Sequence, residues 1–80
     1  MTELMAEAGR ITGPVAEIDG KIVFGLQAAS AKLAGQKPMR FAASASQMTG
    51  LSDGDLIVVR FNRADHGTVA GPLPVASISR

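Results

Sequence analysis

Apolar and polar positions alternate in short runs along this chain of 80 residues, a pattern typical of β-strands that bury one face. The clearest run covers residues 21–27, where Ile22, Phe24 and Leu26 share a face. Residues 56–61 are apolar on both faces, so this strand is either buried on both sides or covers a partner. The full pattern predicts strands at residues 10–18, 21–27, 39–45, 56–61 and 75–78.

Turn signals separate these runs. Asp19-Gly20 is a two-residue hairpin signal, and residues 50–55 form a polar turn that contains two glycines. Gly13-Pro14 interrupts the first strand, which is predicted to bend or lie at an edge there because proline removes a ladder donor. Five short strands predict a small closed or half-closed antiparallel barrel. Its predicted core consists of Ile11, Val15, Ile22, Phe24, Leu26, Phe41, Ile57, Val59 and Phe61.

Two segments between the strands have a different composition. Residues 28–35 are rich in alanine and lack β-branched residues, which favours a short helix or a long loop after the second strand. Residues 42–49 are small and polar and suit a one-turn helix between the third and fourth strands. Residues 1–9 are predicted to be a flexible N-terminal segment, which leaves residues 10–80 as a single barrel domain.

Composition and charge narrow the classes of protein. The chain has no Cys, its hydrophobic fraction of 46% is ordinary for a globular protein, and its net charge is only +1. Residues 20–52 contain four basic residues and no acid, which predicts a mildly positive face; the four are Lys21, Lys32, Lys37 and Arg40. No signal peptide and no apolar stretch of about 20 residues is visible, so we expect a soluble, cytoplasmic protein.

Residues for catalysis or metal binding are sparse. A single His excludes a cluster of histidine ligands, and Asp53-Gly54-Asp55 lacks the alternation of a calcium-binding loop and is interpreted as a turn. No pair of carboxylates lies in an apolar context, and no glycine spacing matches a phosphate loop. We therefore expect no enzyme activity, no cofactor and no metal site.

The order of motifs resembles the cold-shock domain family. Residues 13–15 resemble its opening strand, residues 23–27 a remnant of its first ribonucleoprotein motif, and residues 39–44 its second motif. Residues 54–61 and 71–78 resemble the following turn and strand and the closing strand. The resemblance covers residues 10–80, with an enlarged loop at 28–36. It implies an all-β, five-stranded antiparallel barrel of the OB type that binds single-stranded RNA or DNA.

The ring-bearing positions of that family are only partly kept. Arg40 stands where Phe is usual and Ala42 where His is usual, so most of the rings that stack on bases in the family are missing. Because stacking contributes roughly 1–3 kcal/mol per base, the resemblance predicts weak binding. The residues predicted to bind nucleic acid are Lys21, Phe24, Lys37, Arg40, Phe41 and Arg60.

Two alternatives remain open. The first is an OB-like module that has lost the stacking face and binds a protein partner, or forms a homodimer. The second is another small barrel, such as a double-psi barrel or the N-terminal barrel of a rotary ATPase subunit, which residues 10–15 resemble locally. Exposure of Phe24, Arg40 and Phe41 together, beside Lys21 and Lys37, would favour nucleic acid. Burial of both rings, with an exposed apolar patch elsewhere, would favour a protein partner.

The fourth predicted strand raises a related question. A barrel interior takes only alternate residues of a strand, so Leu56 and Val58 are predicted to be covered from outside. Residues 4–5, residues 28–33 or a second chain are the candidates for that cover.

Overall fold

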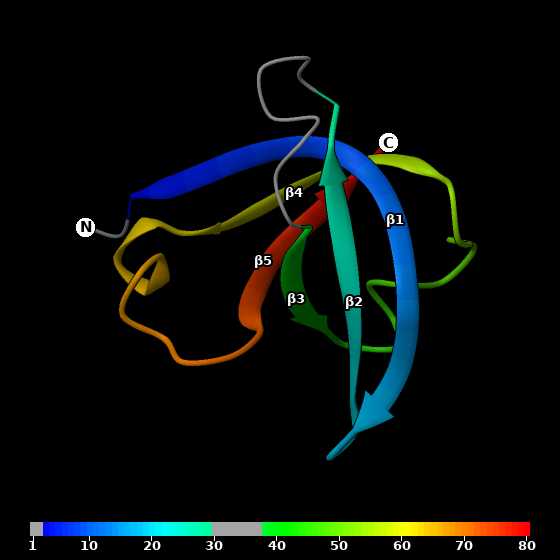
Figure 1. Cartoon of the computed structure of the whole chain (residues 1–80), viewed down its shortest axis with the longest axis horizontal. Coiled ribbons are helices and arrows are strands. Elements are labelled where there is room, and N and C mark those ends of the chain that lie inside the picture. Colours follow the sequence, from blue (N-terminus) through cyan, green and yellow to red (C-terminus); the bar gives the residue numbers. More distant parts are fainter. Residues whose placement is uncertain (1–2, 30–37) are drawn as a thin grey trace.

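Five strands and one short 3-10 helix make up the described part of the chain. The structure, a computed structural model, describes residues 3–29 and 38–80. Its elements, in chain order, are β1 (Leu4–Ile18), β2 (Lys21–Ala28), β3 (Met39–Ala43), β4 (Leu56–Asn62), the 3-10 helix η2 (Arg63–Asp65) and β5 (Leu73–Ser79) (Figure 1). The predicted all-β class is confirmed.

The strands close into a barrel in the order β1-β2-β3-β5-β4, and β4 pairs back onto β1. Four of these pairings are antiparallel, but β3 and β5 run parallel, with Phe41 opposite Leu73 and Ala42 opposite Pro74. The prediction of a purely antiparallel sheet is therefore wrong. After β4 a long connection leads to β5, which pairs with β3 in the parallel orientation. Sequence order alone does not reveal this pairing.

The first strand is longer than predicted. Residues 4–9, expected to be flexible, form the first half of β1 and pair with β4. The second half of β1 pairs with β2 (Figure 1). Gly9 belongs to both ladders, opposite Ile57 and Ala28. A Cβ on Gly9 would lie 2.3 Å from the carbonyl oxygen of Gln27, so this crossing requires glycine. Residues 1–2 lie outside the described residues.

The predicted irregularity in β1 and the predicted hairpin are both present. The register of β1 against β2 shifts between Thr12 and Ala16, the stretch that holds Gly13-Pro14. Asp19 and Gly20 both have positive φ, 52° and 78°, as a two-residue primed turn requires, and Ile18 pairs with Lys21 across it. This turn fixes the register of β1 and β2, and so decides which residues face outward.

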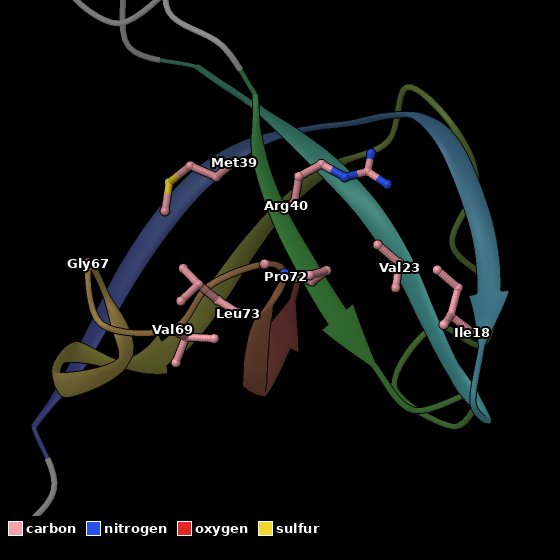
Figure 2. Close-up of a pocket in the computed structure, with 9 residues that line it drawn as sticks. Ile18, Val23, Met39, Arg40, Gly67, Val69, Pro72 and Leu73 are labelled. Atoms are coloured by element: carbon pink, nitrogen blue, oxygen red, sulfur yellow. The ribbon is translucent and has the colours of Figure 1, made fainter.

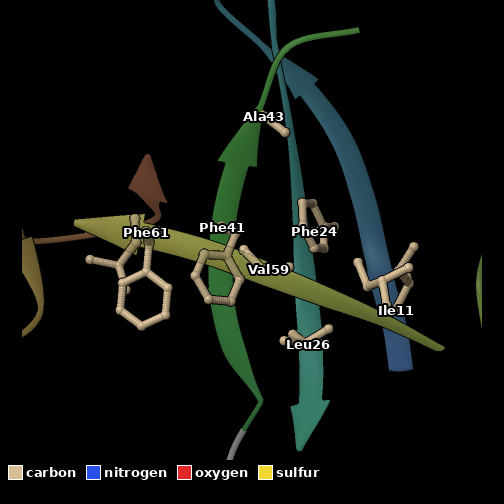
Figure 3. Close-up of a cluster of buried hydrophobic side chains, with 9 residues drawn as sticks. Ile11, Phe24, Leu26, Phe41, Ala43, Val59 and Phe61 are labelled. Carbon is tan, nitrogen blue, oxygen red and sulfur yellow. The ribbon is translucent and has the colours of Figure 1, made fainter. Parts of the chain in front are cut away.

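The barrel interior is filled by three Phe rings and aliphatic residues (Figure 3). The Phe41 ring lies between the other two, with centroid distances of 5.8 Å to Phe24 and 5.3 Å to Phe61. Two members of the predicted core are wrong: Val15 is half exposed in the irregular part of β1, and Ile22 is only partly buried near the hairpin end. The core cluster is Ile11, Phe24, Leu26, Phe41, Ala43, Ile57, Val59, Phe61 and Leu73.

The connection between β3 and β4 forms hydrogen-bonded turns rather than the predicted helix. Ser44 and Gln47 form a reciprocal capping pair: the Gln47 N–H donates to Ser44 Oγ, and the Ser44 N–H donates to Gln47 Oε1. The turn ends at Gly50, whose φ of 77° does not continue a helix. The helix or loop predicted at residues 28–35 lies largely outside the described residues; within it, Ala28 ends β2.

Candidate functional site

An open groove of about 500 Å³ lies at β3, between residues of the β1–β2 hairpin on one side and the connection between β4 and β5 on the other (Figure 2). It combines one end of the β1–β2 hairpin, the start of β3 and the end of the connection. Its lining is mostly apolar and consists of Ile18, Val23, Met39, Arg40, Gly67, Val69, Gly71, Pro72 and Leu73. These residues are distant in the sequence and meet only because the barrel closes.

Strand alternation decides which side chains reach the outer side of β2 and β3. Phe24 and Phe41 face each other inside the barrel, so their neighbours Val23 and Arg40 project from the opposite side. Lys21 is exposed, and because it is two residues from Val23 it lies on the same face of β2. We call this outer surface of β2, β3 and the second half of β1 the groove face.

Arg40 crosses from β3 over β2 on the groove face (Figure 2). It pairs with Gly25 in the β2–β3 ladder and is half buried. A Cβ on Gly25 would lie 3.4 Å from Arg40 Nη1 and 3.0 Å from Thr12 Cγ2. The guanidinium therefore lies in contact with the space that the missing side chain leaves open. Arg40 is the one charged residue among the described residues that line the groove.

The wall of the groove is the connection between β4 and β5. Asn62 caps η2, with its Oδ1 accepting the Ala64 N–H at 3.0 Å. The N–H groups of Thr68 and Val69 then donate to the Asp65 carbonyl, and the Thr68 hydroxyl donates to the Ala64 carbonyl. These bonds hold the wall in a defined turn, from which Val69 extends toward the groove (Figure 2).

The structure separates the residues predicted to bind nucleic acid. Phe24 and Phe41 are 0% exposed and pack in the core, so the prediction that they stack on bases is wrong. The alternation of strand residues turns both rings inward, where a barrel with three aromatic residues needs its bulk. Arg40 lines the groove and Lys21 lies on the same face, whereas Lys37 lies outside the described residues.

Arg60 belongs to another part of the surface. It is exposed on β4, and its Nη1 donates to Ser79 Oγ on β5 at 3.1 Å. β4 is separated from β3 by β5 in the barrel order, so Arg60 does not share a strand pair with Arg40. Arg40 and Arg60, both predicted to bind nucleic acid, therefore lie on strands that do not pair with each other.

Sequence reasoning did not find Val23, Val69 or Pro72 as site residues. Val23 precedes the core residue Phe24 in β2, so its side chain lies on the outer side of the strand, and this position brings it into the groove. Val69 carried one usable signal: it is a β-branched apolar residue between glycines in a loop, and it is 37% exposed. Nothing local in the sequence indicates that this loop lies over β3.

A second apolar surface lies on the outer side of β1 and β4. It is the face opposite to the one from which Ile57 and Val59 point into the core. Leu4 and Leu56 are 50% and 51% exposed, and Val58 is partly buried. Residues 4–5 pair beside β4 instead of covering it, so that part of the predicted cover is wrong. We call this surface, formed by Leu4, Ala6, Ala8, Leu56 and Val58, the β1–β4 face.

Groups suited to metal chemistry or to spanning a membrane are not found in the described part. Among residues 3–29 and 38–80, no three His, Cys, Asp or Glu side chains lie close enough together to hold a metal ion. No helix within these ranges has the length and apolar character needed to cross a membrane. No family model, curated protein or solved structure matches the chain.

Proposed function

We propose that this chain is an OB-like binding module whose groove takes an extended segment of a protein partner. OB barrels bind ligands on the face of strands 2 and 3 and at the connection between strands 4 and 5. The groove has this position, since Val23 and Arg40 come from β2 and β3, and Val69 from the β4–β5 connection. The position of the groove supports a binding role, and its lining indicates the ligand.

The burial of both rings is the observation that favours a protein over a nucleic acid. Each exposed ring would contribute roughly 1–3 kcal/mol by stacking on a base, and Phe24, Phe41 and Phe61 are all in the core. The apolar lining instead gains roughly 25 cal/mol for each Å² of apolar ligand surface that it removes from water. Apolar side chains of a peptide supply such surface without a run of phosphates.

Weak binding of single-stranded RNA or DNA is the second candidate function. The position of the groove favours it, because oligonucleotides are among the ligands that OB barrels bind at this face. Arg40 and Lys21 give the groove face a positive charge. With so few cations and all three Phe rings buried, we expect a dissociation constant in the micromolar range or above, and binding that weakens with salt.

A parallel titration distinguishes the two candidates. Peptides are selected on the protein from a phage-displayed random library, and their binding is compared by fluorescence anisotropy with that of labelled single-stranded DNA and RNA at two salt concentrations. We expect selected peptides to bind at least as tightly as the nucleic acids and to lose less affinity in high salt, since apolar contacts release no counterions.

Val69→Asp is the matched test of the groove, and Val15→Asp is its control. Both valines are exposed, but only Val69 lines the groove. We expect Val69→Asp to weaken peptide binding about tenfold or more and Val15→Asp to leave it unchanged. Failure to select any peptide, together with measurable binding of single-stranded DNA, would overturn the proposal in favour of the second candidate. Equal effects of the two variants would remove the groove as the site.

A further inference from the structure

We propose that Asp19 is a site of spontaneous covalent modification, at which the peptide bond to Gly20 moves to the side-chain carboxyl group and the residue becomes isoaspartate. The chain contains a second Asp-Gly pair, Asp53-Gly54, and the fold protects that pair. The two dipeptides are identical in sequence, and the structure holds them in very different ways. This inference goes beyond the proposed function and does not depend on it.

An aspartate followed by a glycine is suited to this reaction. The backbone nitrogen of the glycine attacks Cγ of the protonated carboxyl group, a C–N bond forms, and the hydroxyl group leaves as water with the proton of the amide nitrogen. Water then opens the resulting succinimide ring at either carbonyl group, which gives aspartate or isoaspartate. Glycine lacks the Cβ that would crowd the attacking nitrogen, and it adopts backbone angles that other residues avoid.

Asp19 and Gly20 lie at an exposed tip of the molecule. All of residues 15–21 are exposed, and Figure 1 shows the tip of the β1–β2 hairpin extending beyond the other strands. Within residues 3–29 and 38–80, the Gly20 N–H makes no hydrogen bond and the Asp19 carboxylate makes no ion pair. Asp19 also has a φ of 52°, the one positive value at a non-glycine residue in the described part, so opening of the turn relieves an unfavourable backbone conformation.

Asp53 and Gly54 lie in a turn that is tied to the barrel. The Gly54 N–H donates to the carbonyl oxygen of the core residue Ile11 at 2.8 Å, and the Gly54 carbonyl oxygen accepts from Arg10 Nη1 at 3.0 Å. Two further hydrogen bonds join residues 52 and 55 across the turn. The nitrogen that would attack Asp53 therefore has to leave a hydrogen bond to the core before it can react.

Isoaspartate at position 19 changes the length of the turn. It carries the backbone through the former side chain, so the chain gains one methylene group there. The turn has two residues, and Ile18 pairs with Lys21 directly across it. Because a longer backbone does not fit a two-residue turn, we expect the β1–β2 pairing to loosen at this end. Modification therefore weakens the hairpin that carries the groove residues Ile18 and Val23.

Peptide mapping by chromatography and mass spectrometry tests the site. The whole protein is incubated at mildly acidic pH, where part of the carboxyl groups is protonated, both folded (as checked by circular dichroism) and unfolded in urea. We expect the unfolded chain to form isoaspartate at Asp19 and Asp53 at similar rates, and the folded protein to form it about tenfold or more faster at Asp19. Asp19→Glu, whose cyclisation needs a larger ring, should lose the signal at residue 19 and keep the signal at residue 53 unchanged.

Isoaspartate that forms in the folded protein at similar rates at Asp19 and Asp53, or at neither while the unfolded chain forms both, would overturn the inference. A signal that persists undiminished in Asp19→Glu would also overturn it, because the modified residue would then lie elsewhere.

The effect on the hairpin is measured on the separated isoaspartyl form, whose unfolding midpoint in urea is compared with that of the parent protein. We expect a lower midpoint. An equal midpoint would show that the turn accommodates the added methylene group, and would overturn the expected loosening of β1 and β2. None of these results depends on whether the groove binds a peptide.

Discussion

The groove face and the β1–β4 face share the strand β1, but they present apolar side chains in different ways. On the groove face, the β4–β5 connection lines the groove beside β3, Val23 is buried, and Arg40 lies near Gly25. On the β1–β4 face, Leu4 and Leu56 are half exposed beside alanines. The first surface forms a recess with a wall, and the second is the bare outer side of two paired strands.

The arginines of the two faces also differ in their surroundings. Arg10 donates from Nη1 to the Gly54 carbonyl at 3.0 Å, and Arg60 donates to Ser79 Oγ at 3.1 Å, so both engage polar groups of their own chain at the surface. Arg40 also has an interaction within the chain, but it points along the sheet and lines a groove whose other lining residues are uncharged. Exposed apolar area and positive charge occur on both faces, and the recess is what distinguishes a binding site from an ordinary surface.

The largest expected effect concerns Gly9, where β1 pairs with both β4 and β2. Gly9→Ala places a Cβ 2.3 Å from the Gln27 carbonyl oxygen, and a clash with backbone cannot be relieved by a change of rotamer. We expect a loss of about 3 kcal/mol or more in the free energy of unfolding, measured by urea denaturation followed by circular dichroism.

Gly13→Ala is the control for that substitution. Its Cβ would meet only the Val15 nitrogen, at 3.9 Å, so the unfolding midpoint should change little. A wild-type midpoint for Gly9→Ala would mean that β1 does not belong to both ladders at Gly9, and the two faces would then lose their common strand.

The next effect compares the two sides of β4. Val59 is 0% exposed in the core and Val58 is partly buried on the β1–β4 face. Val59→Ala should lower the free energy of unfolding by roughly 1–3 kcal/mol, through lost burial and a cavity, and Val58→Ala by less. Equal losses at the two positions would show that the β1–β4 face is as fully covered as the core.

Val58→Lys asks whether a second chain covers the β1–β4 face. We expect the variant to keep its fold by circular dichroism, because Val58 lies on the outer side of the barrel. Light scattering at micromolar concentration gives the oligomeric state of the wild type. A wild-type dimer that this substitution dissociates would make the β1–β4 face an interface between two copies, whereas a monomer at every concentration would exclude self-association there.

A smaller effect separates the two faces as contacts for nucleic acid. Arg40→Ala should weaken the binding of single-stranded DNA across sequences, and should lower the slope of log affinity against log salt by roughly 0.7, the value for one lost phosphate contact. Arg60→Ala should leave both quantities unchanged, because Arg60 is on β4, away from the groove. Equal effects of the two variants would show that single-stranded DNA binds neither face in preference to the other.

The smallest effect is expected at the start of β1. Arg63 Nη1 lies 2.8 Å from Glu3 Oε1, but both side chains are mostly exposed. Exposed ion pairs contribute little, so Glu3→Gln should change the free energy of unfolding by less than about 1 kcal/mol. A larger loss, measured by the same denaturation, would show that this pair holds the first half of β1 against β4.

Local patterns in the sequence determined much of the barrel. The period-two alternation predicted four of the five strands closely and seven of the nine buried residues that form the core cluster. The Asp19-Gly20 pair predicted the hairpin, since only residues that tolerate positive φ occupy such a turn. The resemblance to an RNA-binding family, in contrast, predicted exposed rings that the barrel places inside.

Tertiary structure decided where the strands pair and where a site forms. The parallel pairing of β3 with β5, the double role of Gly9 and the position of the β4–β5 connection over β3 all join residues that are distant in the chain. Alternation is a local property: it states that Phe41 and Arg40 face opposite ways. The partners on each side are set by closure of the whole barrel, so Arg40 lines a groove only because closure brings Val69 and Pro72 of the β4–β5 connection to the same part of the surface.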